Sequence, residues 1–265
     1  MSNSFIIGQY VPGSSIVHRL DPRTKMTIIF FFVIIVFLAN SVGSYGVLIV
    51  FALLSMFITR IPIHYIVKGL TPVWFLIIFT FILHLFVTRE GTVLFEIYTF
   101  KVYSGGVIQG FAIAMRFFLL ILVTSLLTLT TTPIEITDAI EDMLEPLKKI
   151  KFPVHELALM MSISLRFIPT LMQETEKISK AQASRGVDFK TGPIKERAKA
   201  IVPLLVPLFV SAFKRAEDLA MAMEARGYHG GEGRTKLRAL KIEKRDIFVY
   251  ILFAIVIALL LYTRN

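Results

Sequence analysis

The chain has 265 residues, of which 55% are hydrophobic and only 18% are charged, and its mean hydropathy is +0.70. Since ordinary soluble domains carry about 25% charged residues, this composition excludes such a domain and indicates a membrane protein. The formal net charge is +10, but acidic residues are interleaved with the basic ones. This pattern favours anionic lipid and acidic protein partners over nucleic acid.

The charges are segregated along the chain. Residues 133–246 hold 20 of the 29 Lys and Arg residues and 16 of the 19 Asp and Glu residues. One part of the chain therefore faces water and the other faces lipid. We predict a transmembrane region over residues 1–131, a cytoplasmic part of long amphipathic helices over 132–246 and a C-terminal transmembrane helix over 247–265. The fold class is then an all-α membrane protein with about five spans.

The first helix is predicted to begin at Asp21-Pro22, an N-cap followed by proline at the first helical position. We expect Arg23 and Lys25 to extend toward lipid headgroups, as long basic side chains do near the ends of membrane helices. Residues 26–59 then carry no charge over 34 positions, which is too long for one crossing of a ~30 Å hydrocarbon core. This stretch must therefore turn and cross twice.

Apolar runs separated by polar interruptions predict five spans, at residues 21–39, 45–59, 69–88, 107–131 and 247–263. Polar loops are expected at 60–68 and 89–104. Cytoplasmic loops are enriched in Lys and Arg, and the distribution of these residues places the N-terminus and the charged part in the cytoplasm. No small-residue cleavage site lies near position 30, so we expect no cleaved signal peptide.

Two ionisable side chains fall well inside predicted spans. Arg116 is expected to extend outward or to pair with Glu96, because an unpaired charge at the bilayer centre is costly. A functional role for Arg116 is the alternative. His84 is expected to be a hydrogen-bonded core residue, since no carboxylate or second histidine lies at helical spacing from it.

The cytoplasmic part is predicted to begin with a capping box, Thr132-Pro133-Ile134-Glu135. Acidic residues share one face of the helix that follows, and without matching histidines they indicate a solvated or partner-facing surface rather than a metal site. Two long amphipathic helices are expected to begin at Pro153 and Pro193, with a kink at Pro169. Residues 201–210 of the second are apolar but too few to cross, so we expect them at the inner membrane boundary.

Both long helices end on nearly the same six residues, Ala-Gln-Ala-Ser-Arg-Gly at 181–186 and Ala-Met-Glu-Ala-Arg-Gly at 222–227. One copy alone indicates only a well-formed helix end, since glycine stops helices and a cation suits the C-terminal dipole. Two copies favour a pair of docking tips, from which a guanidinium can form forked hydrogen bonds with a partner's carboxylate. The predicted tips are Ala183, Ser184, Arg185 and Gly186, and Glu224, Ala225, Arg226 and Gly227.

These paired motifs, the run from Lys214 to Tyr228 and the segment Leu20-Asp21-Pro22-Arg23-Thr24-Lys25 resemble the T component of bacterial energy-coupling factor (ECF) transporters. The resemblance covers nearly the whole chain. It implies a scaffold in the bacterial cell membrane that links two cytoplasmic ATPases to one or more substrate-binding membrane proteins, the S components, for uptake of vitamins or other micronutrients. It also implies that Arg185 and Arg226 contact the ATPases, and that ATP and Mg are bound by those partners rather than by this chain.

Further residues are candidates for structural roles or for contact with an S component. Asp21, Pro22 and Arg23 belong to the segment that carries the resemblance, and Arg116 could serve in moving the S component. Methionine is flexible and polarisable, so Met160, Met161 and Met172 are candidates for a surface that accepts unlike partners. Ordinary packing at helical spacing is the alternative for these methionines.

The sequence lacks a P-loop, a Gly-x-Ser-x-Gly motif and a His-Glu-x-x-His motif, and it has no cysteine. We therefore expect neither catalysis nor a bound metal or cofactor in this chain. Open alternatives are a T component dedicated to cobalt or nickel, and a membrane anchor or scaffold without transport. A membrane-bound enzyme acting on lipids or isoprenoids would have only the acidic face after Pro133 as support.

Overall fold

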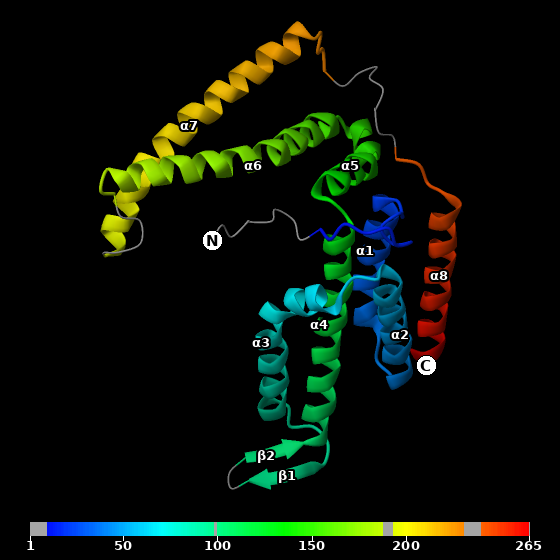
Figure 1. Ribbon diagram of the computed structural model, residues 1–265. Helices are drawn as coiled ribbons and strands as arrows, with labels where there is room; N and C mark the ends of the chain where they lie inside the picture. The colour runs from blue at the N-terminus through cyan, green and yellow to red at the C-terminus, as the bar shows by residue number, and fades with distance from the viewer. Residues whose placement is uncertain (1–9, 98–99, 188–192, 231–239, 265) are drawn as a thin grey trace. The chain divides into compact units, whose positions relative to one another are not determined.

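The computed structural model describes residues 10–97, 100–187, 193–230 and 240–264, and over these ranges the chain is mostly helical (Figure 1). The elements are α1 (Pro22–Leu38), α2 (Val42–Thr59), α3 (Ile63–Val87), β1 (Val93–Ile97), β2 (Phe100–Tyr103), α4 (Ser104–Thr130), α5 (Pro133–Leu144), a 3-10 helix (Glu145–Ile150), α6 (Val154–Ser184), α7 (Ile194–Ala225) and α8 (Lys244–Arg264). They form two compact units, Met1–Ala139 with Leu240–Asn265, and Ile140–Ala239.

Several of these helices are long and apolar enough to cross a membrane. Within the described ranges, α2, α4, α6 and α8 meet this condition singly, and α3 meets it as two segments, Ile63–Thr71 and Val73–Val87, that meet at 57°. The prediction of an all-α membrane protein with about five spans is confirmed, although the candidate spans are not the same five: α1, the predicted first span, has 17 residues and is not among them, whereas α6 is. The interpretation of α6 as an amphipathic helix outside the bilayer rests on its residue pattern and stays a prediction.

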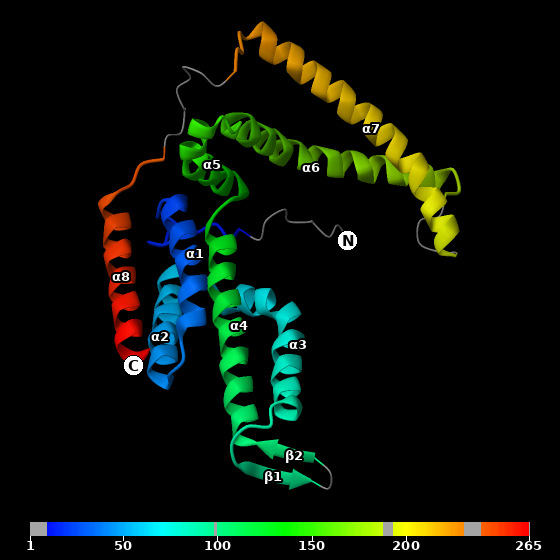
Figure 2. The ribbon, with the colours of Figure 1, turned by 180° about the vertical axis from the view of Figure 1, so that it is seen from behind.

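In the first unit, α1, α2, α4 and α8 pack around one apolar core, and α8 lies beside α2 (Figure 2). Phe32, Leu48, Leu119 and Leu260 are among the fully buried side chains of this core. α3 packs along α4, where Gly106 and other small residues allow close approach. A Cβ added to Gly106 would lie 2.8 Å from the carbonyl oxygen of His84, so only glycine fits at that contact.

The ends of the helices in this unit meet in two groups, as alternating crossings require. At one end, the side chain of Ser41 donates to the carbonyl of Thr263, which joins the start of α2 to the last turn of α8 at 2.6 Å. At the other end, Lys25 of α1 contacts Thr130 of α4, and Asp21 contacts Asp246 of α8. The first and last helices therefore run in the same direction, and α4 runs opposite to them.

Both polar loops predicted between spans need correction. Residues 63–68 are helical and form the first turns of α3, which begins directly after Pro62. The helix bends near position 72, where proline supplies no backbone N–H. The segment 89–104 contains an antiparallel hairpin of β1 and β2, in which Glu96 pairs with Lys101. Runs of β-branched and aromatic residues such as these favour strands.

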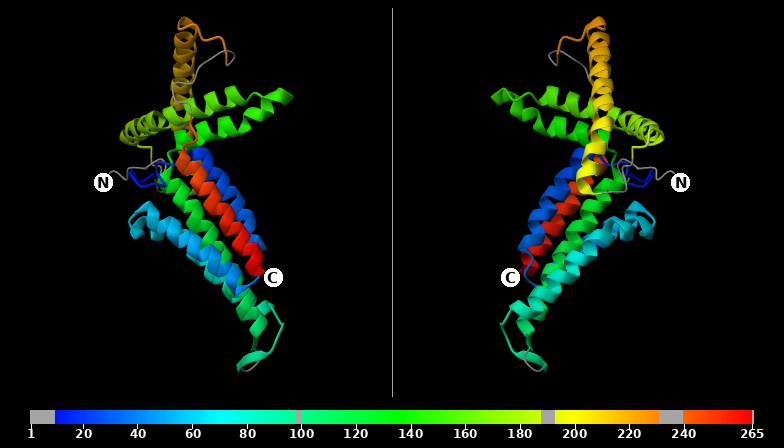
Figure 3. Two further views of the ribbon diagram at one scale, coloured as in Figure 1. Left: turned by 90° about the vertical axis from the view of Figure 1, so that its right-hand side faces the viewer. Right: turned by 90° about the vertical axis from the view of Figure 1, so that its left-hand side faces the viewer.

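The second unit consists mainly of α6 and α7, which cross each other (Figure 3). Glu174 of α6 accepts hydrogen bonds from Ser211 Oγ at 2.9 Å and from the guanidinium of Arg215 on α7. Gln182 donates to the carbonyl of Pro203 at 3.3 Å. Both helices begin after the predicted prolines, and α6 continues without a break through Pro169.

Candidate functional site

The ends of α6 and α7 share one backbone geometry. Arg185 and Arg226 have φ/ψ of −91°/8° and −90°/8°, and each is followed by a glycine with positive φ, +85° at Gly186 and +72° at Gly227. Left-handed backbone of this kind costs a side-chain-bearing residue energy that glycine avoids. The sequence repeat therefore corresponds to a structural repeat.

The hydrogen bonds at the two ends match as well. The backbone N–H of Gly186 donates to the backbone carbonyl of Ala183 at 3.0 Å, and that of Gly227 donates to the backbone carbonyl of Glu224 at 2.9 Å. The next residue in each motif also donates through its backbone N–H to a backbone carbonyl, Val187 to Gln182 at 3.1 Å and Tyr228 to Met223 at 3.0 Å. This pair of bonds defines the Schellman motif, which satisfies the last carbonyls of a helix and fixes the direction of the chain that leaves it.

Each motif leaves its arginine exposed at the tip. All eight residues predicted as docking tips, from Ala183 to Gly186 and from Glu224 to Gly227, are exposed. Among the described residues, no neighbouring atom lies within 4 Å of a Cβ added to Gly186 or Gly227. A guanidinium in this position has hydrogen-bond donors available for a carboxylate on another molecule.

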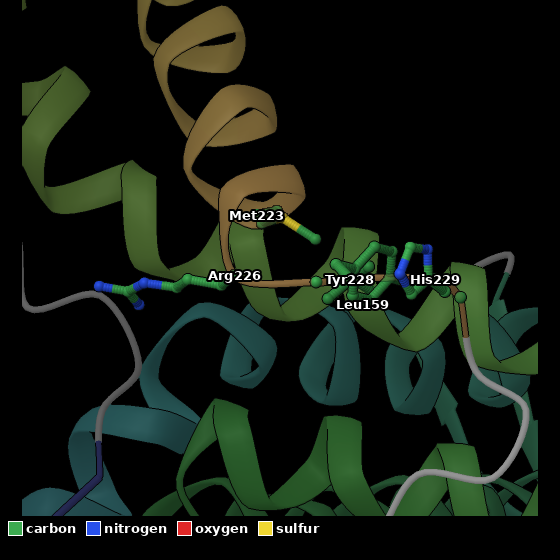
Figure 4. A pocket seen from close by; sticks show the side chains of 7 residues that line it. Leu159, Met223, Arg226, Tyr228 and His229 are labelled. Atoms are coloured by element: carbon green, nitrogen blue, oxygen red, sulfur yellow. The ribbon is translucent and has the colours of Figure 1, made fainter.

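Beside the second tip lies a cavity of about 540 Å³, lined by Leu159 of α6 and by Met223 and the segment from Arg226 to Gly230. In Figure 4 the side chains of Tyr228 and His229 lie on the Leu159 side, whereas Arg226 extends away from them. The structure thus separates the Arg226 side chain from the Leu159 side of the cavity, where the turn after α7 faces α6.

A second polar cluster is buried in the first unit, where α1, α4 and α8 begin or end. Asp246 is 1% exposed and accepts hydrogen bonds from the backbone N–H groups of Asp21 at 2.9 Å and Glu243 at 2.8 Å. Lys25 is 6% exposed and donates through Nζ to the carbonyl of Thr130 at 3.0 Å. Because buried polar groups are costly without partners, these bonds fix the relative position of three helices.

The predicted cap at Asp21 is confirmed, since its carboxylate accepts from the Arg23 N–H at 2.9 Å with proline at the first helical position. The snorkelling predicted for Arg23 and Lys25 is wrong. Arg23 forms an ion pair with Asp21 at 2.8 Å, and Lys25 turns inward to the end of α4. The carbonyls at the end of a helix lack intrahelical donors, so an ammonium is stabilised there.

Burial alone would raise the pKa of Asp21, but the side-chain hydrogen bond from Arg23 opposes this effect. The Arg23 backbone N–H and the charges of Arg23 and Lys25 add to that opposition. Together they hold the pKa of the Asp21 carboxyl below its ordinary value, so the ionised form is the one that stabilises the cluster.

Sequence reasoning missed Asp246, although a signal was present. An acidic residue three positions after a helix's N-cap can accept from the N-cap backbone N–H, as in a capping box, and Asp246 does so with Glu243. Its second bond, to Asp21, joins residues 225 positions apart and has no local signal. Sequence reasoning also gave the acidic face of α5 no histidine partner, yet His155 Nδ1 lies 3.4 Å from Glu141.

The remaining predicted residues occupy separate places. Arg116 donates to the carbonyl of Ala39, the C-cap of α1, at 2.9 Å, while the Glu96 side chain lies outside the described part of the structure. His84 makes the expected hydrogen bond, to Thr88 Oγ1 at 3.3 Å. Met160 and Met161 are exposed and Met172 is half-buried, all on α6. In the described ranges, no three His, Asp or Glu side chains gather in a group that could hold a metal.

α7 carries an exposed apolar face that the sequence indicated through residues 201–210. Side chains at helical spacing along it are exposed, from Val202 (56%) through Val206 and Phe209 to Phe213 (72%). Contiguous exposed apolar surface of this kind marks contact with a membrane or with another protein.

Comparison with known proteins agrees with these features. A family model described as cobalt transport protein, CbiQ, matches residues 13–237. The energy-coupling factor transporter transmembrane protein EcfT of Bacillus subtilis strain 168 is 62% identical over 264 residues, which cover all of both chains. The protein of the same name from Exiguobacterium sibiricum is 54% identical over 260 residues, with 98% of this chain and 99% of the relative covered. The EcfT of Brevibacillus brevis is 52% identical over the full length of both. This chain therefore belongs to the transmembrane proteins, or T components, of energy-coupling factor transporters.

Proposed function

We propose that this T component couples ATP hydrolysis by two cytoplasmic ATPase subunits to substrate uptake through a substrate-binding S component. Arg185 and Arg226 each dock in one ATPase, which binds the ATP and Mg that this chain does not. The observation that carries the proposal is the matched pair of helix ends. Two exposed arginines on identical Schellman motifs suit two partners with similar sockets.

The crossing of α6 and α7 supports a route by which movement passes from the ATPases to the S component. The two helices are joined by Glu174, Ser211 and Arg215, well away from both tips. When the ATPases close, the tips approach and the crossing changes. Packed helices switch between discrete arrangements rather than deforming smoothly, so such a change can be passed on.

The S component is proposed to contact the apolar face of α7 together with Met160 and Met161 of α6. These side chains are exposed, and methionine adapts to partners of different shape. Vitamins or other micronutrients are the proposed substrates, with specificity residing in the S component.

The proposed orientation places the N-terminus and the second unit in the cytoplasm. Basic residues lie near the start of α1 (Arg19 and Arg23) and the end of α2 (Arg60), and many more follow α4. With alternating crossings, these helix ends all lie on one side of the membrane, and basic residues mark the cytoplasmic side. The grouping of the α1 start with the α4 end and the α8 start supports an arrangement in which all three lie on the same side.

Replacing Arg185 or Arg226 with Glu tests the docking of the tips. Each variant is expected to reduce co-purification of an ATPase by tenfold or more, because reversing an interfacial charge replaces attraction with repulsion. Lys177→Glu on α6 and Lys214→Glu on α7 are the matched controls, since both lysines are exposed on the same helices away from the tips. Normal ATPase binding and transport in both arginine variants, with folding intact, contradict the proposal.

A T component dedicated to cobalt or nickel is a second candidate, favoured by the description of the matching family model as cobalt transport protein. Relatives named energy-coupling factor transporter transmembrane protein, with no metal in the name, favour the first candidate. Isolation of the native complex distinguishes them. Several unlike small membrane proteins co-purifying with this chain support a shared T component, and a single metal-transport partner supports the dedicated one.

A further inference from the structure

An apolar groove of about 630 Å³ lies in the first unit, at the end of the helical bundle that carries Asp21 and Asp246. Small-molecule sites in proteins range over about 300–1,000 Å³, so its volume suits a bound ligand. Residues of α1, α2, α4 and α8 line it, together with the segment before α1. None of the docking tips or the α7 face described above contributes to it.

The groove has a buried floor and exposed walls. Ile28, Phe51 and Leu126 form the floor and are each no more than 7% exposed, whereas Phe248 and Leu252 on the wall are exposed. The lining residues of α8 extend from Lys244 to Leu252, which corresponds to about 12 Å along a helix. One leaflet of a ~30 Å hydrocarbon core is about 15 Å deep, so the groove extends through most of one leaflet.

Cations stand at the mouth of this apolar groove. Lys244 and Arg245 line it and are exposed, at the first turn of α8, where the helix dipole also favours negative charge. Arg245 Nε lies 3.6 Å from the Glu243 carboxylate, a looser contact than a hydrogen bond, so the guanidinium retains donors for a ligand. The Lys25 ammonium also borders the groove but is already bonded to Thr130.

We propose that the groove binds one anionic phospholipid, with an acyl chain on the floor and the phosphate between Lys244 and Arg245. An apolar cleft one leaflet deep with two cations at its headgroup end has the charge and polarity of such a lipid. A transmembrane helix from a partner fits less well. Its apolar side chains would fill the floor but leave Lys244 and Arg245 without an anion.

Fluorescence quenching tests the site in the full-length protein in lipid nanodiscs. The chain has one tryptophan, Trp74 on α3, which does not line the groove. The double change Trp74→Phe and Phe248→Trp places a single reporter at the groove wall. Brominated phosphatidylglycerol is expected to quench this reporter with an affinity on the order of tenfold above that of brominated phosphatidylcholine, because two basic residues face the headgroup.

The controls separate this site from general membrane contact. Lys244→Gln with Arg245→Gln is expected to bring the two lipids to equal affinity, whereas Arg264→Gln, at the other end of α8, leaves the preference intact. Native Trp74 should be quenched equally by both lipids. Equal quenching at Phe248→Trp by both lipids, or a preference unchanged in the Lys244 and Arg245 variant, overturns the proposal.

A cross-linking measurement identifies the occupant independently. Since the chain has no cysteine, Ser55→Cys introduces a unique thiol in the groove for a photoreactive label. In the assembled complex, cross-links to phospholipid support the site. Cross-links predominantly to another protein subunit show that a protein segment fills the groove and overturn it.

Discussion

The backbone N–H of Asp21 donates to the carboxylate of Asp246 at 2.9 Å, across 225 positions of sequence. This bond joins the start of α1 to the start of α8. The same carboxylate accepts from the Glu243 N–H at 2.8 Å, so one buried side chain satisfies two helix N-termini. Helix N-termini carry backbone donors without intrahelical partners, which explains why an acidic residue is stable in this buried place.

Asp246→Ala is expected to destabilise the protein strongly. The change leaves the buried N–H of Asp21 and the partly buried N–H of Glu243 without an acceptor, and the loss at a buried donor costs about 1–3 kcal/mol. Thermal unfolding of the purified protein in detergent should show a clearly lower Tm, with a smaller decrease for Asp246→Asn, which keeps one oxygen acceptor. Asp218→Ala on the exposed surface of α7 is the control and should leave the Tm unchanged.

Because the Asp21 carboxylate is stabilised by its partners, the stability of the folded protein is expected to decrease at acidic pH. Its pKa is lower in the folded protein than the ordinary value of 3.8, so the folded state favours the ionised form. The resulting stabilisation is fully present above pH 3.8 and is lost as the pH falls through the lower, folded-state pKa. Asp21→Asn lacks this titration. The Tm difference between wild type and Asp21→Asn should therefore be largest near neutral pH and shrink below pH 3.8, and a difference that grows on acidification contradicts the assignment.

Much of this structure follows from local chemistry and is predictable from the sequence. The Asp21 cap involves residues only two positions apart. The capping box joins Thr132 and Glu135, three positions apart, through a bond from the Thr132 N–H to the Glu135 carboxylate at 2.8 Å and one from the Glu135 N–H to Thr132 Oγ1 at 3.3 Å. The Arg-Gly helix ends likewise depend on one turn of sequence. Such features follow from backbone geometry that neighbouring residues determine.

The features that sequence did not predict depend on distant partners. Lys25 has the pattern of a snorkelling lysine, and only the end of α4 gives it buried acceptors. The β1–β2 hairpin has too few strands to be stable alone, and bonds between Thr92 and Ser104 close it between α3 and α4. In both cases tertiary contacts decided between local alternatives.

The glycines at the docking tips are expected to matter through backbone conformation alone. Within the part of the chain that the structure describes, a Cβ at Gly186 or Gly227 meets no neighbouring atom, but φ of +85° and +72° costs alanine about 1 kcal/mol. Gly227→Ala should weaken ATPase co-purification less than Arg226→Glu does, and Gly227→Asn should restore it, because asparagine tolerates left-handed backbone.

Gly46→Ala is the matched control for these changes. Gly46 lies within α2, also with no atom near an added Cβ but without positive φ, so alanine there should leave ATPase binding unchanged and stabilise the helix by about 0.5–1 kcal/mol. Equal losses from Gly227→Ala and Gly227→Asn would mean that something other than backbone conformation is responsible.

The contact between Glu174 and Arg215 offers a test that separates ATPase docking from transmission of movement. Glu174 also accepts from Ser211 Oγ, so it holds α6 to α7 at their crossing while both tips lie elsewhere. Glu174→Gln is expected to leave ATPase co-purification intact and to lower substrate uptake per ATP hydrolysed several-fold, because the crossing loses its charged contact. Glu176→Gln, two residues along α6, removes an exposed pair with Lys180 and should change neither quantity. The exchanged pair Glu174→Arg with Arg215→Glu should recover part of the coupling. Uptake per ATP hydrolysed is measured in proteoliposomes. A wild-type ratio for Glu174→Gln would show that the crossing does not transmit the movement.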